Sequence, residues 1–338
     1  MIKKLFLALL LLAAIAMGGF FYVKNNIEQF VQQPLRLDEP QLVTVKRGNN
    51  LNTIITTFSE NDWIDAPQYD SLVRRFHPEL TQLKVGTFQI TPDMTFAQAV
   101  KTIISGKEYQ LAITFIEGST FKEWRELFAN AEHLEHKTEQ MSEADIAAAL
   151  GIEREKLEGL FLAETYHYSV GDSDLDILNR ANRKLEAILK KSWEARQQNL
   201  PLKNSYEALI LASIIEKETS VPSERERVAA VFVNRLNKRM RLQTDPTVIY
   251  GMGDRYDGNI RKKDLREPTP YNTYVINGLP PTPIAMPGEA SILAAVNPED
   301  SNYLYFVASG KGGHVFSKNL RDHNRAVQQY LRHLRSNK

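Results

Sequence analysis

Residues 205–219 read SYEALILASIIEKET, and this stretch has the pattern of a helix that is buried on every side. Positions 208–215 are apolar except for Ser213, so the stretch lacks the polar face of a surface helix. Asn204, with Glu207 three positions later, has the spacing of a capping box. The sequence therefore predicts a buried helix that begins after Asn204.

Two acids lie near the end of this helix, and helical spacing separates them. Glu218 follows Ile214 by four residues and Leu211 by seven, so it shares their apolar stripe, whereas Glu216 lies on the face of Ala212. Desolvation raises the pKa of a carboxyl group, and a glutamate that stays protonated near neutral pH can act as a general acid. The alternative is that Glu218 only marks the polar end of a buried helix.

A second helix is predicted directly after the short link at 220–222. Ser223 and Glu226 have the spacing of an N-cap residue and its reciprocal acid. The link presses the two helices together beside Glu218, which is a way to build the wall of a cleft. The predicted buried face comprises Val228, Val231, Phe232 and Leu236, and the predicted surface or ion-pair residues are Arg225, Arg227 and Arg235.

Residues 243–287 are crowded with Gly, Pro, Asn and Tyr, which predicts long structured loops with few helical turns. Loops of that length within a compact domain are usually functional. Their aromatic and amide side chains suit stacking on sugar rings and bonding to sugar hydroxyls, or else they anchor the loops. These side chains are Tyr250, Tyr256, Tyr271, Asn272 and Tyr274.

The remaining chain predicts an α+β protein. A small module at 41–106 repeats a strand–turn–helix pattern, with strands at 43–45 and 87–90. A third strand is predicted at 111–116, and the chain closes with a strand at 303–308 and a helix at 320–334. Further helices are predicted at 51–58, 96–103, 143–150 and 177–197, the last with Lys184, Lys190 and Lys191 on its solvated face.

Residues 5–23 form a run of 19 positions without a charged side chain. As a helix the run is about 28 Å long, close to the thickness of a bilayer core. Lys3 and Lys4 precede it, which predicts a cytoplasmic stub at 1–4, a transmembrane helix at 5–23 and a linker at 24–40. A cleaved signal peptide is the alternative, because 14–16 (AIA) has the form of a cleavage site. Either reading places the bulk of the chain outside the cytoplasm.

Composition excludes several classes of protein. The chain has 338 residues, 42 Lys and Arg against 41 Asp and Glu, and no cysteine. A balanced charge gives no field to hold a nucleic acid, and the absence of Cys excludes thiol nucleophiles, disulfides and cysteine-ligated zinc. Residues 132–136 (EHLEH) lack the spacing of a helical zinc signature, and no phosphate-binding or dinucleotide-binding glycine pattern occurs. We therefore expect no metal and no cofactor.

Several motifs along the chain together carry a family resemblance. In order they are 214–219 (IIEKET), 232–236 (FVNRL), 242–251 (LQTDPTVIYG), 271–274 (YNTY), 278–281 (GLPP), 303–307 (YLYFV) and 313–317 (GHVFS). They closely resemble the membrane-anchored endolytic murein transglycosylases of the YceG-like, or MltG, family. The resemblance covers nearly the whole chain and implies a LysM-like module at 41–106 and a YceG-like catalytic domain at 107–338.

The resemblance implies a peptidoglycan lytic transglycosylase of the bacterial inner membrane, with its catalytic domain on the periplasmic side. Such an enzyme cleaves the MurNAc–GlcNAc bond within glycan strands, leaves 1,6-anhydro-MurNAc ends and limits strand elongation. The catalytic acid and base of the family falls on Glu218, the glutamate that helical spacing also selects. Substrate-binding positions implied by the matching motifs are Asp245, Tyr271, Asn272 and Thr273. Asp245 before Pro246 fits an N-cap equally well.

The chain departs from the family pattern at two places, Glu164 within 161–166 (FLAETY) and Thr282 after the paired prolines. Two other functions stay open. One is a lysozyme-like hydrolase that uses Glu218 with a second acid such as Asp245. The other is a membrane-tethered scaffold that binds peptidoglycan without turnover. The topology suggests peptidoglycan synthases of the same membrane as partners.

Overall fold

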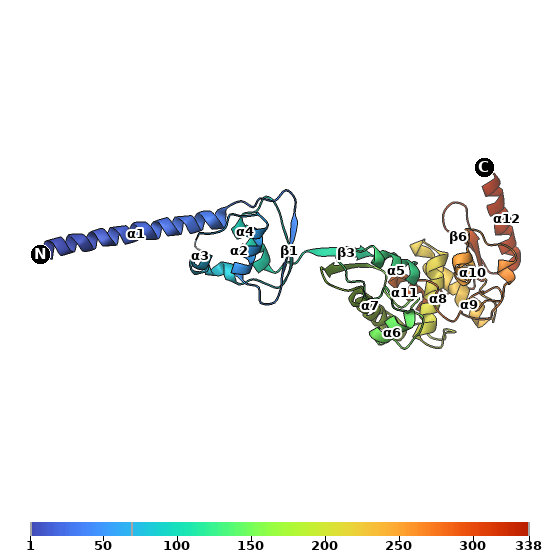
Figure 1. Ribbon diagram of the computed structural model, residues 1–338. Coiled ribbons are helices and arrows are strands. Elements are labelled where there is room, and N and C mark those ends of the chain that lie inside the picture. The colour runs from blue at the N-terminus through green and yellow to red at the C-terminus, as the bar shows by residue number, and fades with distance from the viewer. Residues whose placement is uncertain (1, 69, 337–338) are drawn as a thin grey trace. The chain divides into compact units, whose positions relative to one another are not determined.

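The computed structural model describes residues 2–68 and 70–336, which form mixed helix and sheet as expected (Figure 1). Contacts divide the chain into two compact units. Unit 1 comprises Met1–Leu111 and His167–Gly171, and unit 2 comprises Ala112–Tyr166 and Asp172–Lys338. Position 1 of the predicted stub and positions 337–338 of the predicted catalytic domain lie outside the described residues. The LysM-like assignment of 41–106 stays a prediction.

Unit 1 packs short helices against a two-stranded antiparallel sheet whose register pairs Gln41 with Ile90 and Val45 with Gly86. Phe58, Phe88 and Phe96 are fully buried at its centre. The elements are α1 (Ile2–Gln32), β1 (Gln41–Val45), α2 (Leu51–Glu60), α3 (Asp70–Phe76), the 3-10 helix η1 (Pro78–Thr81), β2 (Gly86–Ile90) and α4 (Phe96–Ser105).

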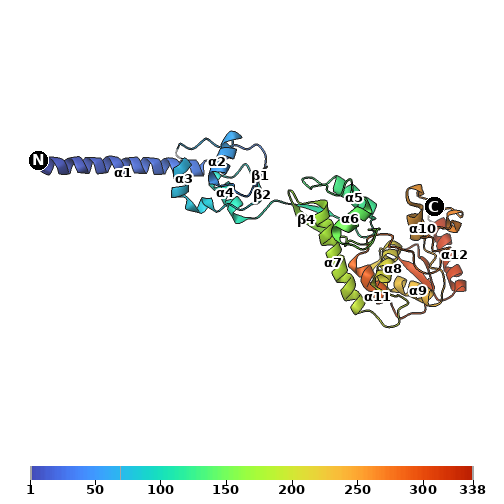
Figure 2. The same ribbon diagram turned by 60° about the horizontal axis from the view of Figure 1, so that its bottom comes forward.

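The first part of the predicted linker at 24–40 is helical, because α1 continues to Gln32 (Figure 2). The reason is an apolar pair one turn apart: Ile27 and Val31 are 2% and 1% exposed and pack into the core of unit 1. The helix ends just before Gln33-Pro34, where proline disfavours helix at the preceding residue. Among the described residues, α1 is the one helix long and apolar enough to span a membrane. Anchors and signal sequences share that property.

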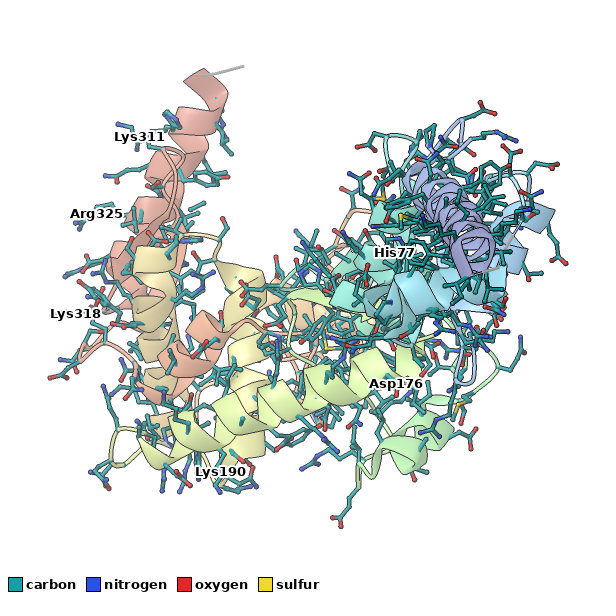
Figure 3. All side chains as sticks on the ribbon, turned by 90° about the vertical axis from the view of Figure 1, so that its left-hand side faces the viewer. His77, Asp176, Lys190, Lys311, Lys318 and Arg325 are labelled. Carbon is teal, nitrogen blue, oxygen red and sulfur yellow. The ribbon has the colours of Figure 1, made fainter. Side chains whose placement is uncertain are left out.

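Unit 2 is built around a helix that solvent hardly reaches. All residues from 208 to 215 in α8 (Ser205–Glu218) are buried, and α8 packs against α7, α9, α10 and α11. Its neighbours are α7 (Asp174–Glu194), α9 (Arg225–Asn237), α10 (Asp245–Met252) and α11 (Glu289–Val296). Burial on all sides is what the uninterrupted apolar sequence requires. On α7, Asp176 lies in the first turn and Lys190 is exposed near the other end (Figure 3).

The other elements of unit 2 flank this helical centre. Strands β3 (Gln110–Thr114) and β4 (Thr165–Ser169) pair, and the division between the units falls within both strands. Strands β5 (Tyr305–Ala308) and β6 (His314–Ser317) form an antiparallel hairpin on which α12 (Leu320–Ser336) packs. The remaining elements are α5 (Phe121–Ala129), α6 (Glu143–Leu150) and the 3-10 helices η2 (Pro222–Glu224), η3 (Gly253–Arg255) and η4 (Asp264–Arg266).

The predicted capping box at Ser223 is wrong. Residues 222–224 form η2, and α9 then begins at Arg225 without a side-chain cap. Glu224 instead reaches the β5–β6 hairpin, where its carboxylate accepts the His314 N–H at 2.8 Å and pairs with His314 Nδ1 at 2.7 Å. A long-range contact thus replaces the local cap that the sequence suggests. Within the predicted loop region, two turns of helix form α10, which begins at Asp245.

Trp124 on α5 should be a main stabilising residue of unit 2. It is fully buried, its ring stacks on Phe115 with centroids 3.7 Å apart, and its Nε1 donates to Ser119 Oγ at 2.8 Å. We expect Trp124→Ala to lower the free energy of unfolding by about 3–5 kcal/mol, measured by chemical denaturation. Trp193→Ala, at a half-buried ring near the end of α7, is the control and should cost about 1 kcal/mol or less. Equal losses in both variants would contradict this view of the core.

Candidate active site

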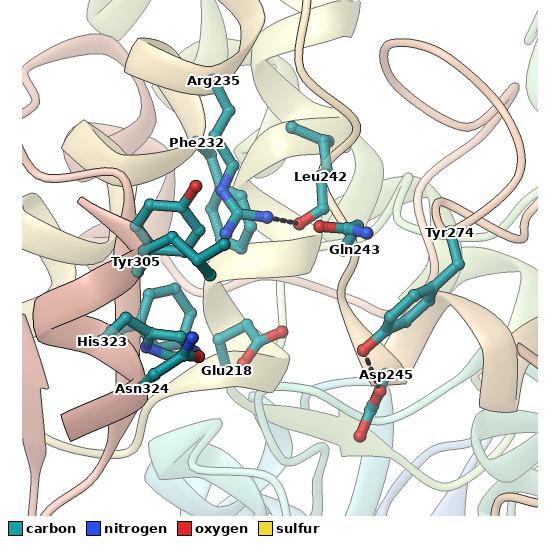
Figure 4. Close-up of a pocket in the computed structure, with 12 residues that line it drawn as sticks. Glu218, Phe232, Arg235, Leu242, Gln243, Asp245, Tyr274, Tyr305, His323 and Asn324 are labelled. Carbon is teal, nitrogen blue, oxygen red and sulfur yellow. Dashed lines mark hydrogen bonds between the residues drawn. The ribbon is translucent and has the colours of Figure 1, made fainter. Parts of the chain in front are cut away.

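A pocket of about 410 Å³ opens beside the C-terminal end of α8 (Figure 4). Residues from α8, α9, the following loop, α10, β5 and α12 converge on it, and they are separated by up to 106 positions in the sequence. Its lining comprises Glu218, Phe232, Arg235, Leu242, Gln243, Asp245, Tyr274, Tyr305, Phe306, Leu320, His323 and Asn324. Two of the five predicted site residues, Glu218 and Asp245, are therefore brought together.

Glu218 is the last residue of α8, where the end of the helix delivers its carboxyl group to the pocket. Burial raises the pKa of Glu218, and the nearby Asp245 charge raises it further. A hydrogen bond that Thr244 Oγ1 donates to Glu218 Oε1 acts in the opposite direction and lowers that pKa. Desolvation is the largest of these effects, so the carboxyl group keeps its proton to a higher pH than an ordinary glutamate.

Glu216, the other acid near the C-terminal end of α8, lies outside the pocket lining. Its carboxylate accepts a hydrogen bond from Gly288 N at 3.0 Å and faces the Arg225 guanidinium at 3.9 Å. These contacts tie α8 to the start of α11 and to α9. Helical spacing predicts that Glu216 and Glu218 lie on different faces of α8, and only Glu218 lines the pocket.

Thr273 lies behind the pocket and acts on it through Thr244. Thr273 is fully buried, its Oγ1 accepts the Thr244 N–H at 3.0 Å, and it lies 2.8 Å from Thr247 Oγ1. Thr244 in turn donates to Glu218. Thr273 is thus a positioning residue for the donor to Glu218, and it does not itself line the pocket.

Asp245 is the first residue of α10, and the N-cap position belongs to Thr244, which makes no side-chain cap bond. The N-cap alternative for Asp245 is therefore wrong. Its Oδ1 accepts a hydrogen bond from Tyr274 OH at 2.6 Å, and both residues line the pocket. Burial and the adjacent Asp245 raise the pKa of Tyr274, so the phenol remains a hydrogen-bond donor. Tyr274 belonged to the predicted aromatic set, but the motif-based assignment stopped one residue before it.

Asn272 is buried outside the pocket and shapes the loop that presents Tyr274. Its Nδ2 donates to the backbone oxygens of Asp264 and Glu267 at 3.0 and 2.8 Å, and its Oδ1 accepts the Tyr274 N–H at 3.0 Å. Its side chain thereby uses its bonding capacity on the protein backbone. Within 271–274, Asn272 and Thr273 are positioning residues, and Tyr274 is the residue that reaches the pocket.

Tyr271 also lies outside the pocket lining. Its ring packs on Tyr250 with centroids 4.8 Å apart, and its OH is 2.9 Å from Thr282 Oγ1. Thr282, one of the two departures from the family pattern, thus helps to fix this loop. The other departure, Glu164, forms an ion pair with Lys184.

The predicted surface or ion-pair role of Arg235 is wrong, because Arg235 is 8% exposed and lines the pocket. Its Nε donates to Leu304 O at 2.7 Å and its Nη1 to Leu242 O at 2.8 Å, so backbone oxygens satisfy the buried cation. The sequence held a signal for this position, since Arg235 follows Phe232 and Val228 at helical spacing on the apolar face. Its positive charge also lowers the pKa of Glu218, although less than Thr244 does.

The wall contributed by α12 carries His323 and Asn324, which sequence reasoning did not connect with the pocket. The His323 ring stacks on Tyr305 with centroids 5.2 Å apart. Burial and the Arg235 charge lower the pKa of His323, which favours the neutral ring. The pocket thus combines a carboxyl group that favours its protonated form with the Asp245 carboxylate, the Arg235 cation and neutral hydrogen-bonding side chains. This set can protonate the oxygen of a bound, uncharged substrate.

Glu158 is a second buried carboxyl group, away from the pocket. It accepts the Phe121 N–H at 3.1 Å and a hydrogen bond from Tyr250, yet burial raises its pKa from 4.5 to about 7. A raised pKa in the folded state means that this group's stabilising contribution is lost as the pH rises from about 4.5 to about 7. From about pH 4 to about pH 8, we expect Glu158→Gln to gain roughly 3 kcal/mol of unfolding free energy relative to the wild type.

Denaturant titrations of both proteins across this pH range measure that difference. Asp176→Asn, at an exposed cap whose carboxylate pKa is lowered below its usual 3.8, is the control, and its difference from the wild type should stay almost constant across this pH range. A Glu158→Gln difference that does not change with pH would show that Glu158 is not a buried proton-binding group.

Comparisons with known proteins agree with one another. The sequence model of the YceG-like family matches residues 43–329. The endolytic murein transglycosylase of Bacillus subtilis (strain 168) is 28% identical over 333 residues, which cover 93% of this chain and 90% of the relative. The endolytic murein transglycosylase of Streptococcus pneumoniae (strain R6) is 26% identical, over 96% of this chain and 64% of the relative. The crystal structure of a yceG-like protein from Listeria monocytogenes is similar with a TM-score of 0.52 and 30% identity, over 85% of this chain and 99% of that one.

Proposed function

The chain belongs to the YceG-like family, and from this membership and the geometry of the pocket we propose that it is an endolytic lytic transglycosylase of peptidoglycan. The observation that carries the proposal is Glu218, a partly buried carboxyl group with a raised pKa in a pocket of hydrogen-bonding side chains. The relatives named as endolytic murein transglycosylases support the substrate class. The proposed substrate is therefore the glycan strand, cleaved within its length between MurNAc and GlcNAc.

In the proposed mechanism, one carboxyl group performs both proton transfers. Protonated Glu218 gives its proton to the glycosidic oxygen as the bond from this oxygen to C1 of MurNAc breaks. The resulting carboxylate then takes the proton from the 6-hydroxyl of the same MurNAc as that oxygen bonds to C1. The products are a 1,6-anhydro-MurNAc end and a free GlcNAc hydroxyl, and no water is consumed. The nucleophile is tethered to the reacting carbon, so little orientation entropy is lost in the second step.

The other proposed roles follow from the contacts around Glu218. Thr244 orients the carboxyl group, with Thr273 fixing Thr244 from behind. Asp245 accepts a hydrogen bond from Tyr274, and its negative charge raises the pKa of Glu218. The same charge stabilises the positive charge that develops on the sugar ring in the transition state. Asp245 and Tyr274 are thus the proposed substrate-binding pair of the pocket.

A lysozyme-like hydrolase is the second candidate, because Asp245 supplies a second carboxylate in the same pocket. Mass spectrometry separates the two reactions when the full chain in detergent acts on purified peptidoglycan. We expect anhydro ends, each lighter by one water than the reducing ends that a hydrolase makes. Reducing ends would overturn the transglycosylase proposal, and binding without new ends would leave a scaffold as the better account.

We also propose that α1 is an uncleaved single-pass anchor of the inner membrane, with its N-terminus in the cytoplasm and the catalytic unit on the periplasmic side. Its support is the exposed apolar surface of α1 together with Lys3 and Lys4 before the run. This topology would place the enzyme beside peptidoglycan synthases, where cleavage of new strands would limit their elongation. Absence of any synthase after crosslinking in intact membranes would contradict the partnership.

A further inference from the structure

The helix α1 joins unit 1 without a flexible segment between them. Val23 packs against the core of unit 1, and Ile27 and Val31 are buried within it. Glu28 on α1 lies 3.5 Å from His77, which follows α3 (Figure 3). Because side chains along about two turns of α1 are held in this way, the position of α1 fixes the position of unit 1.

A contact between two aromatic rings shows at which level along the axis of α1 the helix α3 lies. The Phe20 ring lies 5.8 Å from the Phe76 ring, centroid to centroid, and Phe20 belongs to the apolar run 5–23. With a helical rise of about 1.5 Å per residue, Phe20 lies only about 5 Å before the end of this run. If α1 spans the bilayer, Phe76 must therefore lie at the boundary between hydrocarbon and headgroups, where aromatic side chains are enriched.

Positive charge accompanies Phe76 at this level. Arg74 and Arg75 are exposed on the last turn of α3, and Lys24 follows the apolar run directly. Among the side chains of residues 2–68 and 71–335, neither arginine forms an ion pair, whereas the nearby acids Glu28 and Glu79 both contact His77. Among the side chains that the structure describes, these basic groups thus have no ion-pair partner.

We propose that the α3 face of unit 1, defined by Arg74, Arg75 and Phe76, lies in the headgroup layer of the membrane and binds anionic phospholipid headgroups. The inference rests on the proposed anchoring by α1. Continuity with the apolar run favours lipid over a wall polymer, because Phe76 touches the run itself. Exposed arginines beside an aromatic ring suit the phosphates of an anionic surface. Unit 1 then contacts the bilayer at two places, through α1 and through the α3 face.

The absence of cysteine from the chain permits a direct test with single labels. The full chain is reconstituted into nanodiscs of zwitterionic lipid alone or with a third of the lipid anionic. Arg75→Cys, Arg47→Cys and Leu12→Cys each carry one nitroxide, and collision with a water-soluble nickel chelate reports exposure to water. Arg47 is the matched control, an exposed arginine two residues after β1, and β1 lies at the other end of unit 1 from α3 (Figure 1). Leu12, midway along the apolar run, reports the anchor itself.

We expect the label at 75 to collide with the chelate several-fold less often than the label at 47, and the difference to grow when anionic lipid is present. The label at 12 should be shielded in both lipids. If the label at 12 is shielded from the chelate while the label at 75 is as accessible as the label at 47, the headgroup proposal is overturned and the proposed anchor stands. Equal shielding of 75 in both lipids would overturn the preference for anionic headgroups. Exposure of the label at 12 would overturn the anchor, and the inference would fail with it.

Discussion

Replacement of Glu218 by Gln should abolish the formation of new strand ends, lowering the rate by about 10²–10⁴-fold or more. The amide keeps the size of the side chain, and its oxygen still accepts the hydrogen bond from Thr244, so the pocket should keep its shape. What the amide cannot do is give a proton to the glycosidic oxygen or take one from the 6-hydroxyl. Release of muropeptides from purified peptidoglycan measures the rate, and co-sedimentation with peptidoglycan measures binding.

Glu216→Gln is the matched control on the same helix. Glu216 lies outside the pocket, and its contacts with Gly288 and Arg225 are structural. We expect this variant to retain activity within a few-fold, with a lower free energy of unfolding. If Glu218→Gln retained wild-type activity while Glu216→Gln lost it, the general acid would be misassigned. Loss of peptidoglycan binding in Glu218→Gln would assign Glu218 to binding instead of proton transfer.

Two substitutions beside Glu218 should shift the pH dependence of activity in opposite directions. The active form in the first step is protonated Glu218, so kcat/KM should fall as the pH rises through its pKa. Asp245 raises that pKa and the Thr244 hydrogen bond lowers it. We therefore expect Asp245→Asn to move the falling limb to lower pH and Thr244→Val to move it to higher pH.

Profiles of kcat/KM against pH for the two variants and the wild type provide the measurement, with Thr244→Ser as the control that retains the hydroxyl donor. The serine variant should keep the wild-type limb. Shifts of both variants in the same direction would show that the limb belongs to another group. If Asp245→Asn were as inactive as Glu218→Gln at every pH, Asp245 would have a role in bond cleavage, as in the hydrolase.

Much of the fold is readable from local patterns. Several elements show a pattern that can be recognised within a few residues of sequence. They are the apolar run of α8, the amphipathic helices α7 and α12, and the strands β1 and β2. Side chains three or four residues apart meet on a helix wherever it lies in the molecule. The same spacing selected Glu218 over Glu216. Two predictions that failed rested on local patterns as well. The linker predicted from residue 24 is helical to Gln32 because Ile27 and Val31 pack into the core, and the cap predicted at Ser223 is replaced by the contact of Glu224 with His314.

The sequence by itself therefore determined the helical centre, the apolar N-terminal run and the acid at the end of α8. The tertiary structure alone decided which other side chains reach that acid. Thr273 and Tyr274 are neighbours in the chain, yet Thr273 supports Thr244 from behind while Tyr274 enters the pocket with Asp245. An irregular loop lacks the regular side-chain repeat of a helix or strand. Sequence spacing therefore cannot predict which of two neighbouring residues points into the pocket. His323 meets the pocket from more than a hundred residues away, because α12 packs on the hairpin that carries Tyr305.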